Sequence, residues 1–205
     1  MFFKECDKMS KKNLKGGALL APVPPALITC GNMEKPNVFT VAWTGIINTV
    51  PPKTYISVRP ERFSYELIDK SGEFVINLPT ENLVRAVDFC GVRSGKNIDK
   101  FKETGLIPEK CDFVSCPQLE QSPLSLACKV FEKIELGSHH MFLADIVGVS
   151  ADENLFDKND RLCLEKAGLI AYAHGDYYTL GKRLGDFGFS VRKKKTPPKK
   201  RSKRK

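Results

Sequence analysis

The sequence predicts a mainly β fold with peripheral helices, in the form of a closed or split antiparallel barrel. Proline and glycine divide the 205 residues into short segments, and most apolar runs have the length of strands rather than helices. Two longer runs, 124–136 and 141–150, flank the turn GSHH and predict a hairpin. The chain has neither a G-x-G-x-x-G segment nor a P-loop, so the common parallel nucleotide-binding folds are not favoured.

The remaining strands are expected where short apolar runs lie between turn residues, at 26–29, 38–47, 54–58 and 74–78. The predicted helices, each bounded by a cap or stop residue, are 64–70 before Gly72, 81–90 between Thr80 and Gly91, and 97–104 before Gly105. Gly168 interrupts the apolar pattern of 162–178, so no element is assigned there.

The length suits one domain with a full core. We expect an N-terminal extension at 1–17, a globular domain at 18–191 and a basic tail at 192–205. The net charge of +9 comes from that tail, which carries ten lysines and arginines and no acid from Arg192 to Lys205. The rest of the chain has 23 basic residues against 24 acidic ones, a net charge of −1.

The tail has almost no apolar side chain to bury, so it is predicted to be disordered. Its charge also fits an electrostatic handle for nucleic acid, an anionic surface or a nuclear import receptor. The near-neutral domain argues against nucleic-acid binding by the fold itself, because such binding normally spreads positive charge over the folded surface.

Seven cysteines without a C-x-x-C pair predict free thiols in a reducing cytoplasm rather than a disulfide framework. Cys111 and Cys116 share the segment CDFVSC, but no second pair with nearby histidine completes a metal site, so none is expected. Three histidines are too few to support a hydrolytic triad. No signal peptide or membrane span is recognised, and a cytoplasmic location without membrane contact is expected.

One segment has the chemistry of a phosphate site. SVRPERFSY places Arg59, Arg62 and Ser64 within six positions, with Ser64 near a predicted helix start. Backbone amides at a helix N-terminus favour anions, and arginine pairs with phosphate through two parallel hydrogen bonds. The same segment also fits a solvated strand-to-helix turn whose arginines face water.

A second segment could hold a planar ring. Trp43, the only tryptophan, lies in the strand-like run FTVAWTGII beside Thr44 and Gly45, with Asn48 nearby. Small and polar neighbours would let the backbone approach a planar ligand. A buried core tryptophan is the structural alternative.

A third segment, SGKNIDK, gathers Ser94, Lys96, Asp99 and Lys100 in one turn and the start of a helix. A surface loop capped by Asp99 is the alternative reading. Together the three segments supply what flavin mononucleotide (FMN) needs: cations and amides for the phosphate, an apolar slot for the ring and hydrogen bonds for its polar edge.

Five segments occur in an order that resembles a known family: PNVFTVAWTGIINTVPP, ISVRPERFSYELI, GEFVINLP, DFCGVRSGKNIDKF and GSHHMFLADIVGV. They resemble the flavin reductase-like, FMN-binding split-barrel family, in particular its flavoredoxin-type members, over residues 18–178. The resemblance implies an FMN-binding split β-barrel that forms a homodimer. One non-covalent FMN per subunit is expected near the subunit interface.

By that resemblance, the residues that would contact or surround the cofactor are Asn37, Trp43, Thr44, Arg62, Ser64, Ser94, Lys96, Lys100, His139, His140 and Tyr172. Asn37 and Trp43 would line the flavin ring, and Arg62 and Ser64 would take the phosphate. Lys100 would reach the cofactor from the following loop. Either histidine of the doublet could match the family's histidine.

The resemblance implies an FMN-binding oxidoreductase or electron carrier that passes electrons from NADH, NADPH or a redox partner to flavin, ferric iron or another acceptor. No proton-transfer catalyst is named, because hydride transfer to a ring needs an open face more than acid–base residues. Two alternatives stay open: a binding module that acts through its basic tail, and a split barrel that binds haem or another planar ligand through His139 or His140.

Overall fold

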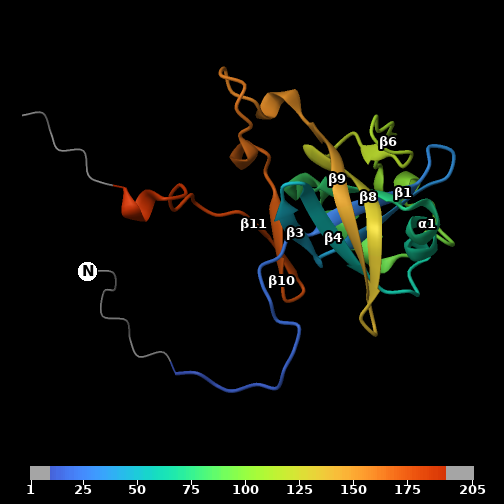
Figure 1. The fold of residues 1–205 in the computed structure, drawn as a ribbon, viewed down its shortest axis with the longest axis horizontal. Coiled ribbons are helices and arrows are strands. Elements are labelled where there is room, and N and C mark those ends of the chain that lie inside the picture. The colour runs from blue at the N-terminus through green and yellow to red at the C-terminus, as the bar shows by residue number, and fades with distance from the viewer. Residues whose placement is uncertain (1–9, 193–205) are drawn as a thin grey trace, which may run out of the picture.

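The computed structural model describes residues 10–192. Its centre is a seven-stranded sheet with the order β2-β1-β5-β8-β9-β4-β3, and every neighbouring pair is antiparallel (Figure 1). The strands are β1 (Ala26–Gly31), β2 (Pro36–Val41), β3 (Thr44–Thr49), β4 (Pro52–Val58), β5 (Glu73–Leu78), β8 (Leu124–Glu135) and β9 (His140–Ala151). The predicted mainly β class is confirmed.

The sheet curls into a barrel that stays open along one line. β2 and β3 follow each other in the chain, yet they form opposite edges of the sheet. Only Ala42 and Trp43 separate them, and the Ser57 amide of β4 donates to the Trp43 carbonyl at 2.9 Å. The two edges therefore meet at this point and diverge beyond it, which is the split of a split barrel.

The prediction of one strand over 38–47 is therefore wrong. Apolar residues continue across Ala42 and Trp43, and such a run cannot distinguish one strand from two that belong to opposite edges. The predicted hairpin across residues 137–140 is present, with β8 paired to β9 along their length.

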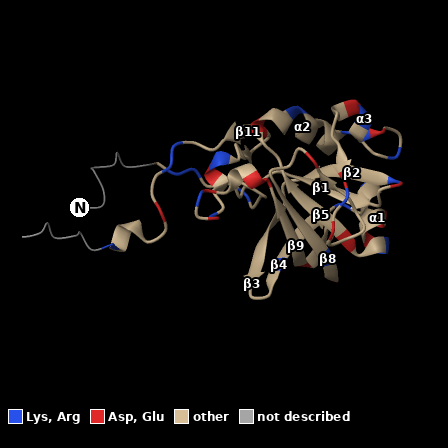
Figure 2. Ribbon diagram, turned by 90° about the horizontal axis from the view of Figure 1, so that it is seen from above, with Lys and Arg blue, Asp and Glu red and all other residues tan. Residues whose placement is uncertain are grey.

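Three α-helices surround the barrel: α1 (Phe63–Ser71), α2 (Val84–Val92) and α3 (Lys100–Thr104). α2 and α3 lie on the side of β1 and β2, whereas β3, β4, β8 and β9 extend away from them (Figure 2). α1 contributes Ile68 to the barrel interior. The interior consists of side chains from both ends of the sheet order: Ala26, Ile28, Cys30, Phe39, Val41, Ile56, Val58, Phe74, Ile76, Cys128, Phe142 and Ala144.

Two of the predicted helices have different bounds in the structure. Thr80 precedes a 3-10 turn (Glu81–Leu83) rather than an α-helix, and its side chain makes no capping hydrogen bond. α2 continues past Gly91 and ends at Val92. Its C-cap residue, Arg93, is extended, so the helix does not stop at a left-handed glycine. The third helix is shorter than predicted and begins after its N-cap Asp99, whose carboxylate accepts from the Lys102 amide.

Short elements complete the chain. They are β6 (Pro108–Glu109), β7 (Gln118–Leu119), β10 (Ile170–Ala173) and β11 (Asp176–Thr179), with 3-10 turns at Glu153–Leu155, Leu164–Lys166 and Phe189–Val191. The unassigned region 162–178 thus contains a hairpin. Within residues 10–192 no helix is long and apolar enough to cross a membrane. The tail prediction, apart from Arg192, lies outside the described residues.

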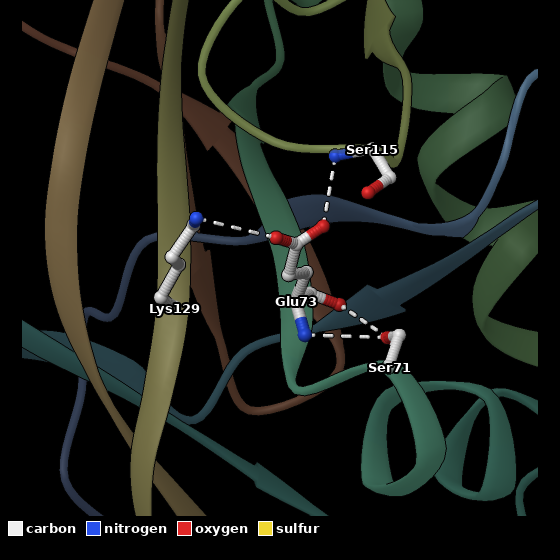
Figure 3. Close-up of polar contacts among 4 residues, drawn as sticks. All are labelled: Ser71, Glu73, Ser115 and Lys129. Atoms are coloured by element: carbon white, nitrogen blue, oxygen red, sulfur yellow. Dashed lines mark hydrogen bonds and ion pairs between the residues drawn. The ribbon is translucent and has the colours of Figure 1, made fainter.

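Glu73 ties the start of β5 to the loop that covers its outer face. Its carboxylate accepts from the Ser115 amide at 2.8 Å and lies 3.6 Å from the Lys129 ammonium, while Ser71 bonds its backbone (Figure 3). Burial alone would raise the pKa of Glu73, but the Ser115 hydrogen bonds and the Lys129 charge together lower it. The carboxylate is therefore more stable as an anion in the folded protein.

We expect Glu73→Gln to reduce the pH dependence of stability in acid. Because the folded pKa of Glu73 lies below its ordinary value of 4.5, its contribution is fully present above about pH 4.5 and is lost as pH falls through the folded pKa. The stability difference between wild type and Glu73→Gln, from urea unfolding at several pH values, should shrink on acidification. Glu120→Gln, at an exposed carboxylate, is the control. A constant difference would contradict the assignment.

Candidate functional site

A cavity of about 340 Å³ opens where the two edges of the barrel diverge. We call it the seam cavity. It is lined by Pro25, Phe39, Thr40, Val41, Ala42, Trp43, Ser57, Val58, Arg59, Arg62, Asp88, Gly91, Val92, His139, Tyr172 and Tyr177. β2 pairs with β1 on one side only, so its free edge forms one wall and offers backbone donors and acceptors.

The lining of the seam cavity includes three charged groups. Arg59 and Arg62 follow β4, and the Arg62 guanidinium donates to the Gly91 carbonyl at 2.7 Å, which joins α1 to α2. Asp88, one turn before Gly91 on α2, lies 3.5 Å from the Tyr177 hydroxyl. Burial, with the nearby Asp88 charge, raises the pKa of Tyr177 to about 12, so its phenol stays protonated at neutral pH.

Trp43 and His139 form an aromatic corner of the seam cavity. Their ring centroids are 4.4 Å apart, and Trp43 is 44% exposed rather than buried in the core. His139 immediately precedes β9, and the Ser138 hydroxyl lies 3.0 Å from its Nδ1. Burial and the charge of Arg59 lower the pKa of His139, so the imidazole is neutral at pH 7.

A second, smaller hollow of about 160 Å³ lies at the N-terminus of α1, and we call it the helix hollow. It shares Phe39, Arg62 and Val92 with the seam cavity, so the two spaces are adjacent. The rest of its lining is Glu61, Phe63, Ser64, Arg93, Ser94, Gly95 and Lys100. No side chain caps the first turn of α1, which leaves its first amides free for a ligand.

Lys100 forms the floor of the helix hollow. It is only 4% exposed, and its ammonium donates to the Val38 carbonyl at 2.8 Å and the Cys90 carbonyl at 3.0 Å. Burial lowers the pKa of Lys100, while burial raises the pKa of the Cys90 thiol to about 11. The thiol therefore stays neutral beside the ammonium, which retains a donor beyond these two hydrogen bonds.

Asn37 lies behind the helix hollow and fixes its wall. Its amide donates to the Ser64 hydroxyl at 2.7 Å. A Cβ on Gly95 would come within 2.0 Å of the Asn37 Oδ1, so the turn containing Ser94 can pack here only because residue 95 is glycine. The prediction that Asn37 lines a flavin ring stays a prediction; in the structure its amide bonds to Ser64 of the helix hollow.

The predicted residues divide into three groups by position. Trp43, Arg62, His139 and Tyr172 line the seam cavity, and Arg62, Ser64, Ser94 and Lys100 line the helix hollow. Neither lining includes Asn37, Thr44, Lys96 or His140.

Three of these four side chains have other surroundings. The Thr44 hydroxyl donates to the Tyr55 carbonyl at 2.6 Å, and Lys96 is exposed. His140 Nδ1 lies 2.7 Å from the Tyr65 hydroxyl, whereas its neighbour His139 faces the seam cavity. Of the doublet left open by sequence, His139 is thus the member at the site.

Sequence reasoning missed Asp88 and Tyr177 in the lining. Both come from segments that the sequence did not link to β2: Asp88 from α2 and Tyr177 from β11. The helical spacing of the buried Val87 and Cys90 identifies the covered face of α2, but it identifies neither the strand beneath that face nor the exposed Asp88 as a lining residue.

Comparisons with known proteins agree with this architecture. Residues 19–181 match the flavin reductase like domain. An uncharacterised protein of Archaeoglobus fulgidus is 30% identical over 131 residues, which cover 64% of this chain and 73% of that protein.

Two solved structures share the fold. Flavoredoxin of Desulfovibrio vulgaris (Miyazaki F) has a TM-score of 0.83 and 29% identity, over 89% of this chain and 100% of that one. Flavoredoxin from Methanosarcina acetivorans has a TM-score of 0.79 and 23% identity, over the same shares of the two chains. The predicted family is confirmed: the chain belongs to the flavin reductase like domain family.

Proposed function

We propose that this protein is an FMN-dependent oxidoreductase or electron carrier, with the flavin ring in the seam cavity and the phosphate in the helix hollow. The observation that carries the proposal is that these two spaces are adjacent and share Phe39, Arg62 and Val92 in their linings. One space is aromatic with a strand edge, and the other is cationic. Their chemistry matches the two ends of one FMN molecule.

The helix hollow fits a phosphate by charge and by donors. Arg62, Arg93 and Lys100 supply positive charge against the single carboxylate of Glu61, and Ser64 supplies a hydroxyl. The uncapped first turn of α1 adds backbone amides and the positive end of the helix dipole. Asn37 holds Ser64 in place, so its proposed role is to position the phosphate ligand rather than to contact the ring.

The seam cavity fits a planar ring. Its volume is within the range of small-molecule sites, about 300–1,000 Å³. The free edge of β2 can hydrogen-bond the polar rim of the ring, while Trp43 and Tyr172 supply aromatic contacts. Bound there, FMN supplies a ring that accepts and returns two electrons. Because His139 is neutral, Arg59 and Arg62 are the only positively charged side chains in the described lining of the seam cavity. Their charge suits an anionic electron donor such as NADH or NADPH.

We also propose that the protein is a homodimer that covers the face of the molecule formed by β3, β4, β8 and β9. Neither α2 nor α3 lies over these strands (Figure 2). Large apolar side chains are exposed along these strands and in the β3–β4 turn, namely Ile46, Val50, Phe131, Val147 and Val149. Exposed apolar groups on an edge hairpin favour pairing with another chain. A second copy is the simplest occupant, because a symmetric interface needs only one self-complementary patch.

The double variant Arg62→Ala/Ser64→Ala should bind FMN more weakly, because it removes two phosphate contacts worth about 1–3 kcal/mol each. Trp43 is the only tryptophan and borders the proposed ring site, so quenching of its fluorescence measures FMN affinity. Arg161→Ala, at an exposed arginine far along the sequence, is the matched control and should bind like wild type. Equal affinity of all three proteins would place the phosphate elsewhere.

NADH or NADPH should reduce the FMN-loaded protein in the absence of oxygen. The expected result is loss of the absorbance of oxidised flavin on stoichiometric addition of one of the two nucleotides. Free FMN at the same concentration is the control for direct reduction. Reduction by neither nucleotide would contradict a nicotinamide-dependent enzyme and favour a carrier that a partner protein reduces.

Ile46→Glu should shift the protein from dimer to monomer, because it places a charge on the proposed apolar interface. Ile46 is exposed, so the substitution should leave the subunit folded. Ile107→Glu, at another exposed isoleucine outside this face, should stay dimeric. Sedimentation equilibrium distinguishes the cases, and a monomeric wild type would rule out the dimer.

A further inference from the structure

A third hollow lies beside the seam cavity and has a different chemistry. It has a volume of about 220 Å³ and lies between the N-terminal segment and the β10–β11 hairpin, and we call it the arm cavity. It is lined by Ala18, Leu19, Leu20, Ala21, Val23, Trp43, Tyr172, His174 and Gly175. The N-terminal segment is held here by two backbone hydrogen bonds between Val23 and Tyr172, at 2.8 and 2.9 Å (Figure 1).

The arm cavity shares Trp43 and Tyr172 with the seam cavity, so these two rings form a common aromatic boundary. The linings otherwise contrast in charge. The seam cavity has Arg59, Arg62 and Asp88, whereas the described residues around the arm cavity include no lysine, arginine, aspartate or glutamate. An ionised ligand would lose its hydration there without gaining an oppositely charged partner. Because this loss is costly, the arm cavity favours an uncharged ligand.

The lining also keeps apolar side chains in contact with water. Leu19 is 50% exposed and Leu20 is 87% exposed, although both belong to the segment that is fixed through Val23. Covering such side chains with an apolar ligand is favourable, at roughly 25 cal/mol per Å² of buried area. The hollow thus combines aromatic rings, aliphatic side chains and the absence of fixed charge, which is the lining typical of sites for small apolar molecules.

His174 adds a polar group at the rim. It occupies the hairpin turn with φ at 53°, next to Gly175 at 98°, a combination that usually selects Asn-Gly. Histidine, like asparagine, is among the residues enriched in this left-handed conformation, so the turn accommodates the imidazole. Its position on the cavity lining allows one directed hydrogen bond to a ligand.

From these observations we propose that the arm cavity binds a neutral, planar aromatic molecule, packed against Trp43 and Tyr172 and covered by Leu19. This site goes beyond the proposed FMN site and does not require FMN to be bound. On the proposed function, the shared aromatic boundary would place the molecule next to the flavin, the position of a substrate.

Nitrobenzene is a suitable probe because it is neutral, planar and quenches tryptophan fluorescence. We expect saturable quenching of Trp43 in the wild-type protein without added flavin. Leu19→Asp should weaken the apparent affinity by about tenfold or more, since it introduces an unpaired carboxylate into the lining. Leu14→Asp is the matched control, because Leu14 belongs to the same segment and is 70% exposed but does not line the cavity. It should bind like wild type.

The proposal fails if quenching rises linearly without saturation, which indicates random collision with an exposed tryptophan. It also fails if Leu14→Asp weakens binding as much as Leu19→Asp. FMN titration of the same three proteins separates this site from the proposed function. If all three proteins bind FMN equally and only Leu19→Asp loses nitrobenzene binding, the arm cavity is a separate site. If Leu19→Asp loses both ligands, the arm cavity is not separate from the flavin site and the proposal is contradicted. If the wild-type protein binds nitrobenzene saturably but does not bind FMN, only the proposed function is contradicted.

Discussion

The architecture depends on one short connection. Ala42 and Trp43 carry the chain from one edge of the sheet to the other, and the hydrogen bond from the Ser57 amide to the Trp43 carbonyl fixes this connection against β4. Beyond it the edge strands β2 and β3 separate, and β2 keeps a free edge. A barrel closed along its full length would have no such edge, so the seam cavity is a direct consequence of incomplete closure.

The helix hollow depends instead on buried polar groups that satisfy one another. Lys100 is held by two backbone carbonyls, and Asn37 by Ser64, so cation and hydroxyl are fixed before any ligand arrives. Side chains that are already ordered lose little further entropy on binding, which favours affinity. Gly95 is part of the same arrangement, because a larger residue would displace the turn from Asn37.

Sequence patterns predicted the class, the hairpin and several residues of the site, because strand length and turn residues are local signals. Trp43, Arg62, Ser64 and Tyr172 lie on the lining, as the resemblance implied, although their ligand contacts stay predictions. The division of 38–47 was not predictable, since an apolar run without a break at residues 41–43 looks the same in one strand or two. Asp88 reached the site only through packing of α2 on β2, which is a long-range contact without a local pattern.

The position of the charged side chains in the structure also differs from what the composition suggests. The overall excess of positive charge belongs to residues 192–205, yet the described domain still concentrates Arg62, Arg93 and Lys100 around one hollow. Net charge therefore says little about anion recognition here.

The lowered pKa of His139 follows from burial and from the charges of Arg59 and Arg62, so the histidine adds no charge at neutral pH. The seam cavity thus has a fixed cationic side and an aromatic corner that is neutral, and beyond that corner lies a cavity whose described lining has no lysine, arginine, aspartate or glutamate. This change of charge between neighbouring spaces gives each proposed ligand a distinct place.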